Sequence, residues 1–243
     1  MTITERQQVI LKLLSEDESI TVKELADKLF VSEPTVRRDF SELERRGLIT
    51  KLYGGARIRR EGAAPDSEIP FLLREKERLP AKVVMGKKAA SLVRDGMVLM
   101  LDGSTSAYNI VPFLEGFKDL IVVTSGAKTA VALAELNINT YSTGGRMIIH
   151  SFSYVGEQAE EFVRHINADL LFFSCRSLSD DGKMTDVSVE EVNLRRAMFA
   201  SAKKKYLMCD SSKLGKTCFY NLGTLDEIDG VISDSDRFET PET

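Results

Sequence analysis

Residues 21–47 read TVKELADKLFVSEPTVRRDFSELERRG, and this stretch decides the fold of the amino-terminal part of the chain. Thr21 precedes Glu24 by three positions, the spacing at which a hydroxyl and a carboxylate cap the first turn of a helix reciprocally. Ser32 is a second candidate for a helix cap, because a proline follows in the first turn, where a missing N–H costs nothing. The stretch therefore predicts two helices joined by a short turn.

An earlier helix is predicted to begin at Thr4, where Gln7 stands at the position of another capping-box partner. In the helix that follows Ser32, apolar residues recur at spacings of four and three and form a stripe that faces the core. Gly47 suits the left-handed residue that commonly follows a helix. Three helices with a short connection between the second and third form a helix-turn-helix. The predicted buried residues are Val9, Ile10, Leu13 and Leu14 of the first helix, Leu25, Ala26 and Leu29 of the second, and Val36, Phe40 and Leu43 of the third.

The outward face of the third helix carries polar and basic residues that suit DNA. Residues at the start of such a helix meet base edges in the major groove, and later ones meet phosphates. Arginine can bind guanine through two hydrogen bonds, and threonine can contact a thymine methyl group. Residues 48–58 predict a small hairpin, or wing, with strands around a turn at Gly54–Gly55. The candidate DNA-binding residues are Ser32, Thr35, Arg37, Arg38, Arg45, Lys51, Tyr53 and Arg57.

Charge is distributed unevenly along the chain. The whole chain has a net charge of −4, whereas residues 37–60 contain eight lysine or arginine residues and three acidic ones. An acidic total does not argue against DNA binding, because the electrostatic footprint of a DNA-binding protein is a local patch. The plain alternative is a three-helix packing unit with a solvated charged face. The agreement of helix caps, apolar stripe, turn and basic wing favours DNA binding over that alternative.

This stretch resembles the DNA-binding domain of the DeoR-type bacterial transcriptional repressors. The resemblance covers residues 1–60 without a gap and includes the run TVRRD at residues 35–39. It implies a winged helix-turn-helix that is fused to a carboxy-terminal sensor of sugar phosphates. Asp39 is expected to orient Arg38 or to hold a neighbouring helix, and not to touch DNA. The other matching positions are Glu5–Arg6, Val31–Ser32, Leu43, Gly47–Leu48 and Tyr53–Ala56.

The chain of 243 residues has room for one or two domains. We expect a winged helix-turn-helix at residues 1–60, a linker at residues 61–75 and an effector-sensing domain at residues 76–243. The charged, small and proline residues of Arg59–Glu68 are typical of a linker.

The sequence contains no run of eighteen apolar residues and no apolar signal region at its start, so we expect a cytoplasmic protein without a membrane span. Cys175, Cys209 and Cys218 are predicted to be reduced thiols, because they show no zinc or disulfide spacing. His150 and His165 are isolated in the sequence and receive no catalytic role. No cofactor or metal site is predicted.

After residue 75, short apolar runs alternate with helical patterns. The run Val98–Leu101 is continuous, as in a strand that is buried on both faces. Strands that alternate with helices predict an α/β domain with a mostly parallel sheet. The predicted strands are Val98–Leu101, Leu120–Val123, one ending at Tyr141, Leu170–Phe173, Tyr206–Cys209 and Val231–Ile232. The predicted helices are Ala81–Val93 with Val84, Ala89 and Leu92 in the core, one through Phe113–Leu114, Ala127–Leu136, Val155–His165 and Glu190–Ala202.

Small polar residues follow several of these strands, and in parallel sheets ligands bind at the carboxyl ends of the strands. Glycine allows a close backbone approach, hydroxyl groups donate hydrogen bonds, and the start of a following helix favours an anion such as phosphate. Lys213 would add a point charge, and Asp102 would accept hydrogen bonds from sugar hydroxyls. Each loop alone is equally well explained as a turn or helix cap, and Arg195–Arg196 is interpreted as an exposed helix face. The candidate effector-binding residues are Asp102, Gly103, Ser104, Thr105, Ser106, Thr124, Ser125, Gly144, Gly145 and Lys213.

This arrangement also resembles the carboxy-terminal domain of the DeoR-type repressors, which is related in fold to ribose-5-phosphate isomerase. The resemblance implies that the loops at the strand ends line a phosphosugar site. Two positions depart from the family pattern. Residues 174–177 (SCRS) stand where many members carry a glycine-bearing loop, and Leu214 stands where phenylalanine is usual.

The favoured hypothesis is a transcriptional repressor of a sugar-metabolism operon that binds double-stranded operator DNA and is released by a phosphorylated sugar. Two half-sites about 34 Å apart would require a homo-oligomer, a dimer or a tetramer. An alternative is a phosphosugar isomerase with an accessory DNA-binding domain. The isomerase run Asp-Gly-Ala-Asp-Glu is absent, and Asp186 and Glu190 are the remaining candidate bases. A third possibility is an oligomerisation module without an effector.

Overall fold

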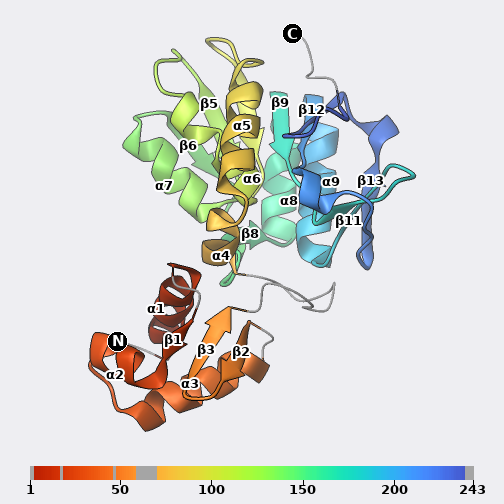
Figure 1. Cartoon of the computed structure of the whole chain (residues 1–243). Coiled ribbons are helices and arrows are strands. Elements are labelled where there is room, and N and C mark those ends of the chain that lie inside the picture. Colours follow the sequence, from red (N-terminus) through yellow and green to blue (C-terminus); the bar gives the residue numbers. More distant parts are fainter. Residues whose placement is uncertain (1–2, 17–18, 46–47, 59–69, 239–243) are drawn as a thin grey trace. The chain divides into compact units, whose positions relative to one another are not determined.

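The computed structural model describes residues 3–16, 19–45, 48–58 and 70–238. The chain divides into two compact units, Met1–Glu77 and Arg78–Thr243 (Figure 1). No helix in the described residues is both long enough and apolar enough to cross a membrane.

The amino-terminal unit is built on three helices, α1 (Ile3–Glu16), α2 (Val22–Leu29) and α3 (Glu33–Arg45). The capping box that the sequence predicts at the start of α2 is confirmed. The Thr21 hydroxyl accepts a hydrogen bond from the Glu24 backbone N–H at 3.2 Å, and the Glu24 carboxylate accepts one from the Thr21 N–H at 2.9 Å. The apolar stripe of α3 is also confirmed, since Val36, Phe40 and Leu43 are buried in the same core as Leu25, Ile10 and Leu14.

The predicted start of the first helix is wrong. The helix begins at Ile3, so that Thr4 lies inside it and does not cap it. Gln7 is buried, and its side-chain amide donates a hydrogen bond to Asp39 of α3 at 3.4 Å. The predicted residues Val9 and Leu13 are only half-buried. Gly47 lies outside the described residues.

The wing consists of β2 (Ile49–Leu52) and β3 (Gly55–Ile58), which pair antiparallel as predicted. Its two turn residues are Tyr53 and Gly54, one position earlier than expected, and Gly54 has the left-handed φ of +79° that favours glycine. A short strand that the sequence did not predict, β1 (Ile20–Thr21), pairs with β3 on its other edge. Gly55 permits this pairing, because a Cβ atom there would lie 2.6 Å from the Ile20 carbonyl oxygen.

Part of the expected linker is helical. Helix α4 (Phe71–Lys76) packs against α1, and its Leu73 is buried in the amino-terminal core. Residues 71–75 therefore belong to the amino-terminal unit, which continues to Glu77. The remainder of the expected linker, apart from Pro70, lies outside the described residues.

The carboxy-terminal unit contains a six-stranded sheet in the order β14-β12-β9-β4-β5-β6, and every pairing in it is parallel. The α/β class and the parallel sheet that the sequence predicts are thus confirmed. Every strand of this sheet overlaps a predicted strand. The strands are β4 (Val98–Leu101), β5 (Ile121–Thr124), β6 (Asn139–Ser142), β9 (Ala168–Phe173), β12 (Ala202–Met208) and β14 (Gly230–Ile232).

Helices cover both faces of the sheet, which explains why its central strands are continuously apolar (Figure 1). Alternate residues of β9 enter different cores: Leu170 and Phe172 pack with one group of helices, and Leu171 and Phe173 with the other. The first group is α5 (Leu79–Ala90), α6 (Thr105–Tyr108) and α7 (Ala127–Glu135), and the second is α8 (Glu157–Arg164) and α9 (Val189–Ser201).

Several elements of this unit differ from the prediction. Val84, expected in the core, is 45% exposed, and the helix expected from Val155 begins only at Glu157. An antiparallel hairpin and a separate three-stranded antiparallel sheet were not predicted. The hairpin is β7 (Arg146–Ile148) and β8 (Ser153–Val155), the small sheet is β10 (Ser177–Leu178), β11 (Lys183–Asp186) and β13 (Tyr220–Thr224), and short 3₁₀ turns lie at η1 (Val111–Phe113), η2 (Ser211–Lys213) and η3 (Leu225–Glu227).

A buried ion pair fixes α3 on α1. Asp39 is 3% exposed and accepts hydrogen bonds from Arg6 Nε at 2.5 Å and Arg6 Nη2 at 3.1 Å. The hydrogen bond to Asp39 raises the pKa of Arg6. Of the two roles expected for Asp39, the structure shows the second, because its carboxylate holds the neighbouring helix α1 and so sets the position of α3.

We predict that Asp39→Ala lowers the free energy of unfolding of the amino-terminal unit by about 2–4 kcal/mol, because it leaves the partly buried Arg6 without its carboxylate. Amide hydrogen exchange of α1 and α3 in the full chain measures this change. The control is Glu33→Ala, which removes an exposed carboxylate from the same helix and should cost less than about 1 kcal/mol. Equal effects of the two substitutions would contradict the prediction.

Candidate nucleic-acid interface and effector site

The predicted DNA-binding residues lie on α3, on the residue before it and on the wing. Seven of the eight are exposed, and Thr35 is half-buried. Ser32 accepts the backbone N–H of Val36 at 3.2 Å through its carbonyl oxygen, and its hydroxyl is hydrogen-bonded to the Thr35 hydroxyl at 2.9 Å. Tyr53 is fully exposed in the turn of the wing. The start of α3 and the wing thus both present polar side chains to solvent.

Three of the cations on this surface are paired with carboxylates of α3. Arg37 Nη2 lies 3.3 Å from Glu33, and Lys51 Nζ lies 2.9 Å from Glu44. Hydrogen bonds from Lys51 lower the pKa of Glu44. The third pair has two bonds, from Arg45 Nε and Nη2 to Glu42, and they raise the pKa of Arg45. Among the described residues, three of the five exposed cations between positions 37 and 58 thus have a carboxylate partner.

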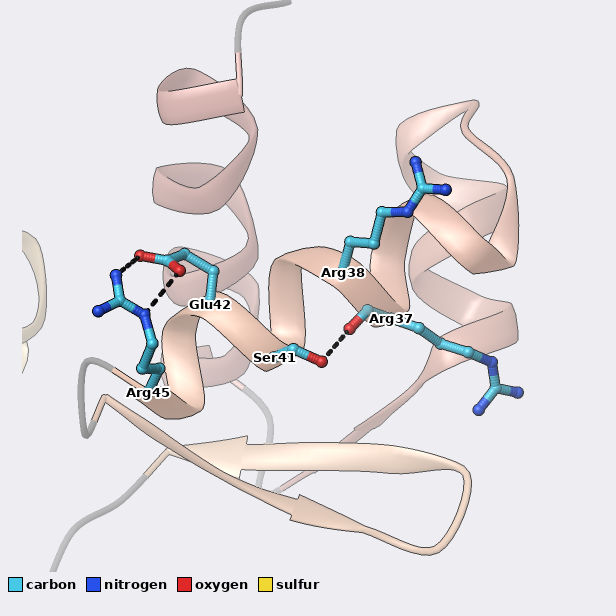
Figure 2. Close-up of a pocket in the computed structure, with 5 residues that line it drawn as sticks. All are labelled: Arg37, Arg38, Ser41, Glu42 and Arg45. Atoms are coloured by element: carbon cyan, nitrogen blue, oxygen red, sulfur yellow. Dashed lines mark hydrogen bonds and ion pairs between the residues drawn. The ribbon is translucent and has the colours of Figure 1, made fainter.

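Arg38 differs from these three cations. It is exposed and has no hydrogen bond or ion pair with any residue that the structure describes. Arg38 lines a hollow of about 370 Å³ together with Arg37, Ser41, Glu42 and Arg45. Figure 2 shows these five side chains on α3. An arginine without an internal partner keeps all of its N–H donors for a base edge or a phosphate.

In the carboxy-terminal unit, Asp102 at the end of β4 organises the predicted effector loops. It is 1% exposed, and one oxygen accepts the Ser104 N–H at 3.0 Å. The other oxygen accepts the Ser174 N–H at 3.1 Å and Arg195 Nε at 2.8 Å. Both oxygens thus already accept hydrogen bonds within the protein, which gives Asp102 a structural role in holding the loops after β4 and β9 together.

Ser174 brings three of the strand ends together. Its hydroxyl donates to the Met208 carbonyl at 2.6 Å, lies 3.5 Å from the Ser106 hydroxyl and accepts a hydrogen bond from Lys213 Nζ at 2.7 Å. Lys213 also lies 3.9 Å from Asp210. Burial works to raise the pKa of Asp210, but the Lys213 ammonium and hydrogen bonds from Ser212 lower it. Lys213 is therefore oriented over the loops after β4 and β9, as a phosphate-binding lysine would need to be.

The loop after β5 also meets the loop after β4. A Cβ atom at Gly126 would lie 3.2 Å from the Cα of Gly103, so that only glycine allows this approach. The Gly144–Gly145 segment takes a different direction, since a Cβ at Gly145 would lie 2.6 Å from the Val155 carbonyl of β8. Among the described residues, neither glycine is hydrogen-bonded to Ser174 or Lys213. The structure thus joins Asp102, Ser106 and Lys213 through Ser174, and it joins Gly126 to Gly103.

Two buried hydroxyl groups beside these loops have no hydrogen-bond partner among the described residues: Thr129 Oγ1 and Ser151 Oγ. Thr129 lies in the first turn of α7, and its hydroxyl would be 2.7 Å from a Cβ at Gly126. A buried hydroxyl without a partner costs about 1–3 kcal/mol, so such groups mark places where a ligand or water supplies the missing bond. Neither residue was predicted from the sequence, because neither directly follows a strand of the parallel sheet.

The position of Arg195 differs from the one that the sequence predicted. It was expected on an exposed helix face, but it is 5% exposed and lies against three carboxylates, whereas only the neighbouring Arg196 is exposed. Arg195 contacts Asp102 at 2.8 Å, Asp186 at 2.8 Å and Glu191 at 3.3 Å. Burial works to lower the pKa of Arg195, but the three carboxylates outweigh it and raise the pKa. Arg195 therefore ties the β4 loop to α9 and to the small antiparallel sheet.

A further group that the sequence did not reveal surrounds the turn η2. Arg78, with a left-handed φ of +56°, donates from Nη2 to the Ser211 hydroxyl at 2.6 Å and to Asp234 at 3.4 Å. Lys82 on α5 is 4% exposed, and its charge helps to lower the pKa of Asp210. Among the described residues, no cluster of three acidic, histidine or cysteine side chains is arranged to hold a metal ion.

Comparison with known families assigns both units. The model of the DeoR C-terminal sensor domain matches residues 77–235, and the model of the DeoR-like helix-turn-helix domain matches residues 6–61. The chain belongs to the DeoR family of transcriptional regulators. It thus joins a helix-turn-helix DNA-binding domain to a sensor domain, which confirms the resemblance seen in the sequence.

Named relatives align along nearly their whole length. The HTH-type transcriptional regulator GolR of Listeria innocua is 33% identical over 232 residues, which cover 95% of this chain and 90% of the relative. The HTH-type transcriptional regulator GlpR of Haloferax volcanii is 30% identical over 238 residues, which cover 96% and 91%. The lactose phosphotransferase system repressor of Staphylococcus epidermidis is 29% identical over 241 residues, which cover 98% and 94%.

Solved structures resemble the chain only at low sequence identity. Ribose 5-phosphate isomerase from Plasmodium falciparum is 14% identical, with a TM-score of 0.41 over 56% of this chain and 52% of the isomerase. The translation initiation factor eIF-2B of Pyrococcus horikoshii is 13% identical, with a TM-score of 0.48 over 95% of this chain and 87% of the factor.

The network around Arg195 generates a stability prediction. Replacing it by methionine leaves two buried carboxylates, Asp102 and Asp186, and the half-buried Glu191 without their cation. Arg195→Met should therefore destabilise the carboxy-terminal unit by about 3–5 kcal/mol. Urea unfolding of the full chain, followed by circular dichroism, measures the loss. Arg164→Met on α8 serves as the control, because its ion pairs with Glu160 and Glu161 are exposed and contribute less than about 1 kcal/mol. A variant at position 195 as stable as the control would refute this role.

Proposed function

We propose that this regulator is a sequence-specific repressor of a sugar-metabolism operon and that a phosphorylated sugar releases it from its operator. The observation that carries the DNA-binding half is Arg38 on the outward face of α3, which is exposed and has no partner among the residues that the structure describes. A helix-turn-helix places the corresponding helix in the major groove, where arginine can bind guanine through two hydrogen bonds. Tyr53, Lys51 and Arg57 of the wing would contact the flanking backbone.

One recognition helix reads only a few base pairs. Two copies related by a two-fold axis would read two half-sites about 34 Å apart, so we propose that the regulator acts as a homo-oligomer, either a dimer or a tetramer.

The effector half rests on the chemistry of the strand ends. Lys213, the hydroxyls of Ser106 and Ser174, and the close approach of Gly103 to Gly126 form a polar edge that suits a phosphoryl group. The unpartnered hydroxyls of Thr129 and Ser151 would suit sugar hydroxyls. The relative named as a lactose phosphotransferase system repressor also favours a sugar-derived effector.

Release from DNA requires that the effector bind two conformations of the protein unequally. The chain enters the carboxy-terminal unit at Arg78, whose side chain is bonded to Ser211 in the same turn as Lys213. A change in that turn on effector binding would act directly on the residue that follows the amino-terminal unit. A coupling of about 1–3 kcal/mol would change DNA affinity some 5–150-fold.

The two candidate bases of the isomerase alternative are both engaged in other interactions. Asp186 is ion-paired with Arg195 and accepts the Val187 N–H, and Glu190 is hydrogen-bonded to Arg146. A base for proton abstraction must be within hydrogen-bond reach of its substrate, and neither carboxylate is left for that task. The family relationship to named transcriptional regulators points in the same direction.

The first test of this proposal concerns Arg38. The wild-type chain should select a preferred duplex from a random DNA pool, and Arg38→Ala should weaken binding to that duplex by about 1–3 kcal/mol, because it removes a base contact. Fluorescence anisotropy at fixed salt measures both affinities. Arg164→Ala, on an exposed face of α8, is the matched control and should bind as the wild type does. Selection of no sequence by the wild type would overturn the DNA-binding proposal.

The second test concerns Lys213. Against a panel of ribose 5-phosphate, fructose 1-phosphate, glycerol 3-phosphate and inorganic phosphate, a phosphorylated sugar should raise the melting temperature of the wild type saturably. Lys213→Met should lose most of this rise, because it removes the proposed charge partner of the phosphoryl group. Lys203→Met, whose exposed ion pair with Asp169 lies at the start of β12, is the control. A panel without any stabilising sugar phosphate would count against the effector half of the proposal.

A further inference from the structure

The ion pair between Glu42 and Arg45 stands apart from the other ion pairs of the DNA-facing surface. Arg45 donates to both oxygens of the same carboxylate, from Nε at 3.0 Å and from Nη2 at 2.7 Å, so the guanidinium is held in one orientation. Figure 2 shows the pair on the outward side of α3, lining the same hollow as Arg38 and Ser41. The side chains are 74% and 40% exposed, so DNA docking on this face would meet both.

We propose that Glu42 is a specificity-determining residue of this DNA-binding surface, because it offsets and orients the charge of Arg45. The inference rests on the proposed DNA-binding function and assigns a role to an acidic residue within it. Glu42 acts through Arg45, and so it is a positioning residue that does not itself read a base.

The physical reason lies in the difference between phosphate and base contacts. Each cation that neutralises a phosphate adds affinity for any DNA sequence, and it steepens the salt dependence of binding by roughly 0.9 log units. Arg37, Arg45 and Lys51 each have a carboxylate partner within the protein, whereas Arg38 has none in the described part of the chain. A carboxylate beside each of these cations reduces their attraction for unrelated DNA, whereas no described carboxylate is bonded to Arg38.

Orientation adds to this effect. With Nε and one N–H of Nη2 directed at Glu42, the Nη1 group of Arg45 makes no bond to a described residue. Its donors are held ready for an acceptor at one position along the groove. A freely rotating arginine could contact phosphates at many positions along the DNA. It would therefore raise the affinity for unrelated sequences more than the affinity for the selected one.

The other two pairs are less suited to this role. The Arg37–Glu33 contact is a single one at 3.3 Å between exposed side chains. Glu44 also accepts the backbone N–H of Lys51 at 3.2 Å, and it therefore fastens the wing to α3. Only Glu42 combines a contact through both carboxylate oxygens with a place in the hollow beside Arg38.

The test compares the full-length wild type with Glu42→Gln for binding to the duplex that the wild type selects and to an unrelated duplex of equal length. Affinity for the unrelated duplex should rise about three- to tenfold, with a salt slope steeper by roughly 0.9. Affinity for the selected duplex should change less, so that the ratio of the two affinities falls. The double variant Glu42→Gln, Arg45→Gln should show the same ratio of the two affinities as the single variant Arg45→Gln.

Glu161→Gln on α8 is the matched control, because Glu161 and Arg164 have the same i, i+3 spacing in the other unit. It should alter neither affinity. An unchanged ratio in Glu42→Gln, with a wild type that does select a sequence, overturns this inference alone. So does an equal fall of the ratio in the Arg45→Gln background, since Glu42 would then not act through Arg45. A wild type that selects no sequence overturns the proposed DNA-binding function and this inference together.

Discussion

The buried ion pair between Asp102 and Arg195 is the interaction on which the edge of the parallel sheet depends. The residues are 93 positions apart, and their contact joins the β4 loop to α9 while the same carboxylate holds the β9 loop through Ser174. Burying these charges has a high cost in desolvation free energy, and the ion pair offsets that cost only when its hydrogen bonds are well formed. The loops that carry Ser104 to Ser106 are consequently fixed before any ligand arrives, which lowers the ordering cost of binding.

Features that arise from a short stretch of sequence could be predicted, whereas features that arise from contacts between distant residues could not. The capping box at Thr21 and the apolar run of β4 are short patterns, and both appear where expected. Strands β11 (KMTD) and β13 (YNLGT) have no apolar run, and they form because they pair with each other. The burial of Arg195 depends on Asp102, far away in sequence, so its helix position alone suggested exposure. Ser174, which gathers Ser106 and Lys213, was hidden for the same reason.

The charge of the surface formed by α3 and the wing also could not be predicted by counting charged residues in the sequence. A count over residues 37–60 gives a strongly basic segment, but three of its cations lie within 3.3 Å of a carboxylate. Exposed pairs of this kind contribute little to folding stability. Their effect is on the electrostatic field that DNA meets, where an unpaired arginine differs from a paired one. If this surface binds DNA as proposed, the pairing would therefore bear more on how the surface discriminates among sequences than on whether it binds.

Each unit contains a buried aspartate that binds an arginine from a segment far away in the sequence. Asp39 fixes α3 through Arg6, and Asp102 fixes the strand-end loops through Arg195. A rigid reading helix and rigid loops leave fewer places where an effector can produce a change. The turn η2 would be one such place, because the bond from Arg78 to its Ser211 is exposed and the bond from its Lys213 to Ser174 is only partly buried. Since Arg78 directly follows the amino-terminal unit, a rearrangement confined to η2 would reach the connection to that unit without disturbing either buried pair.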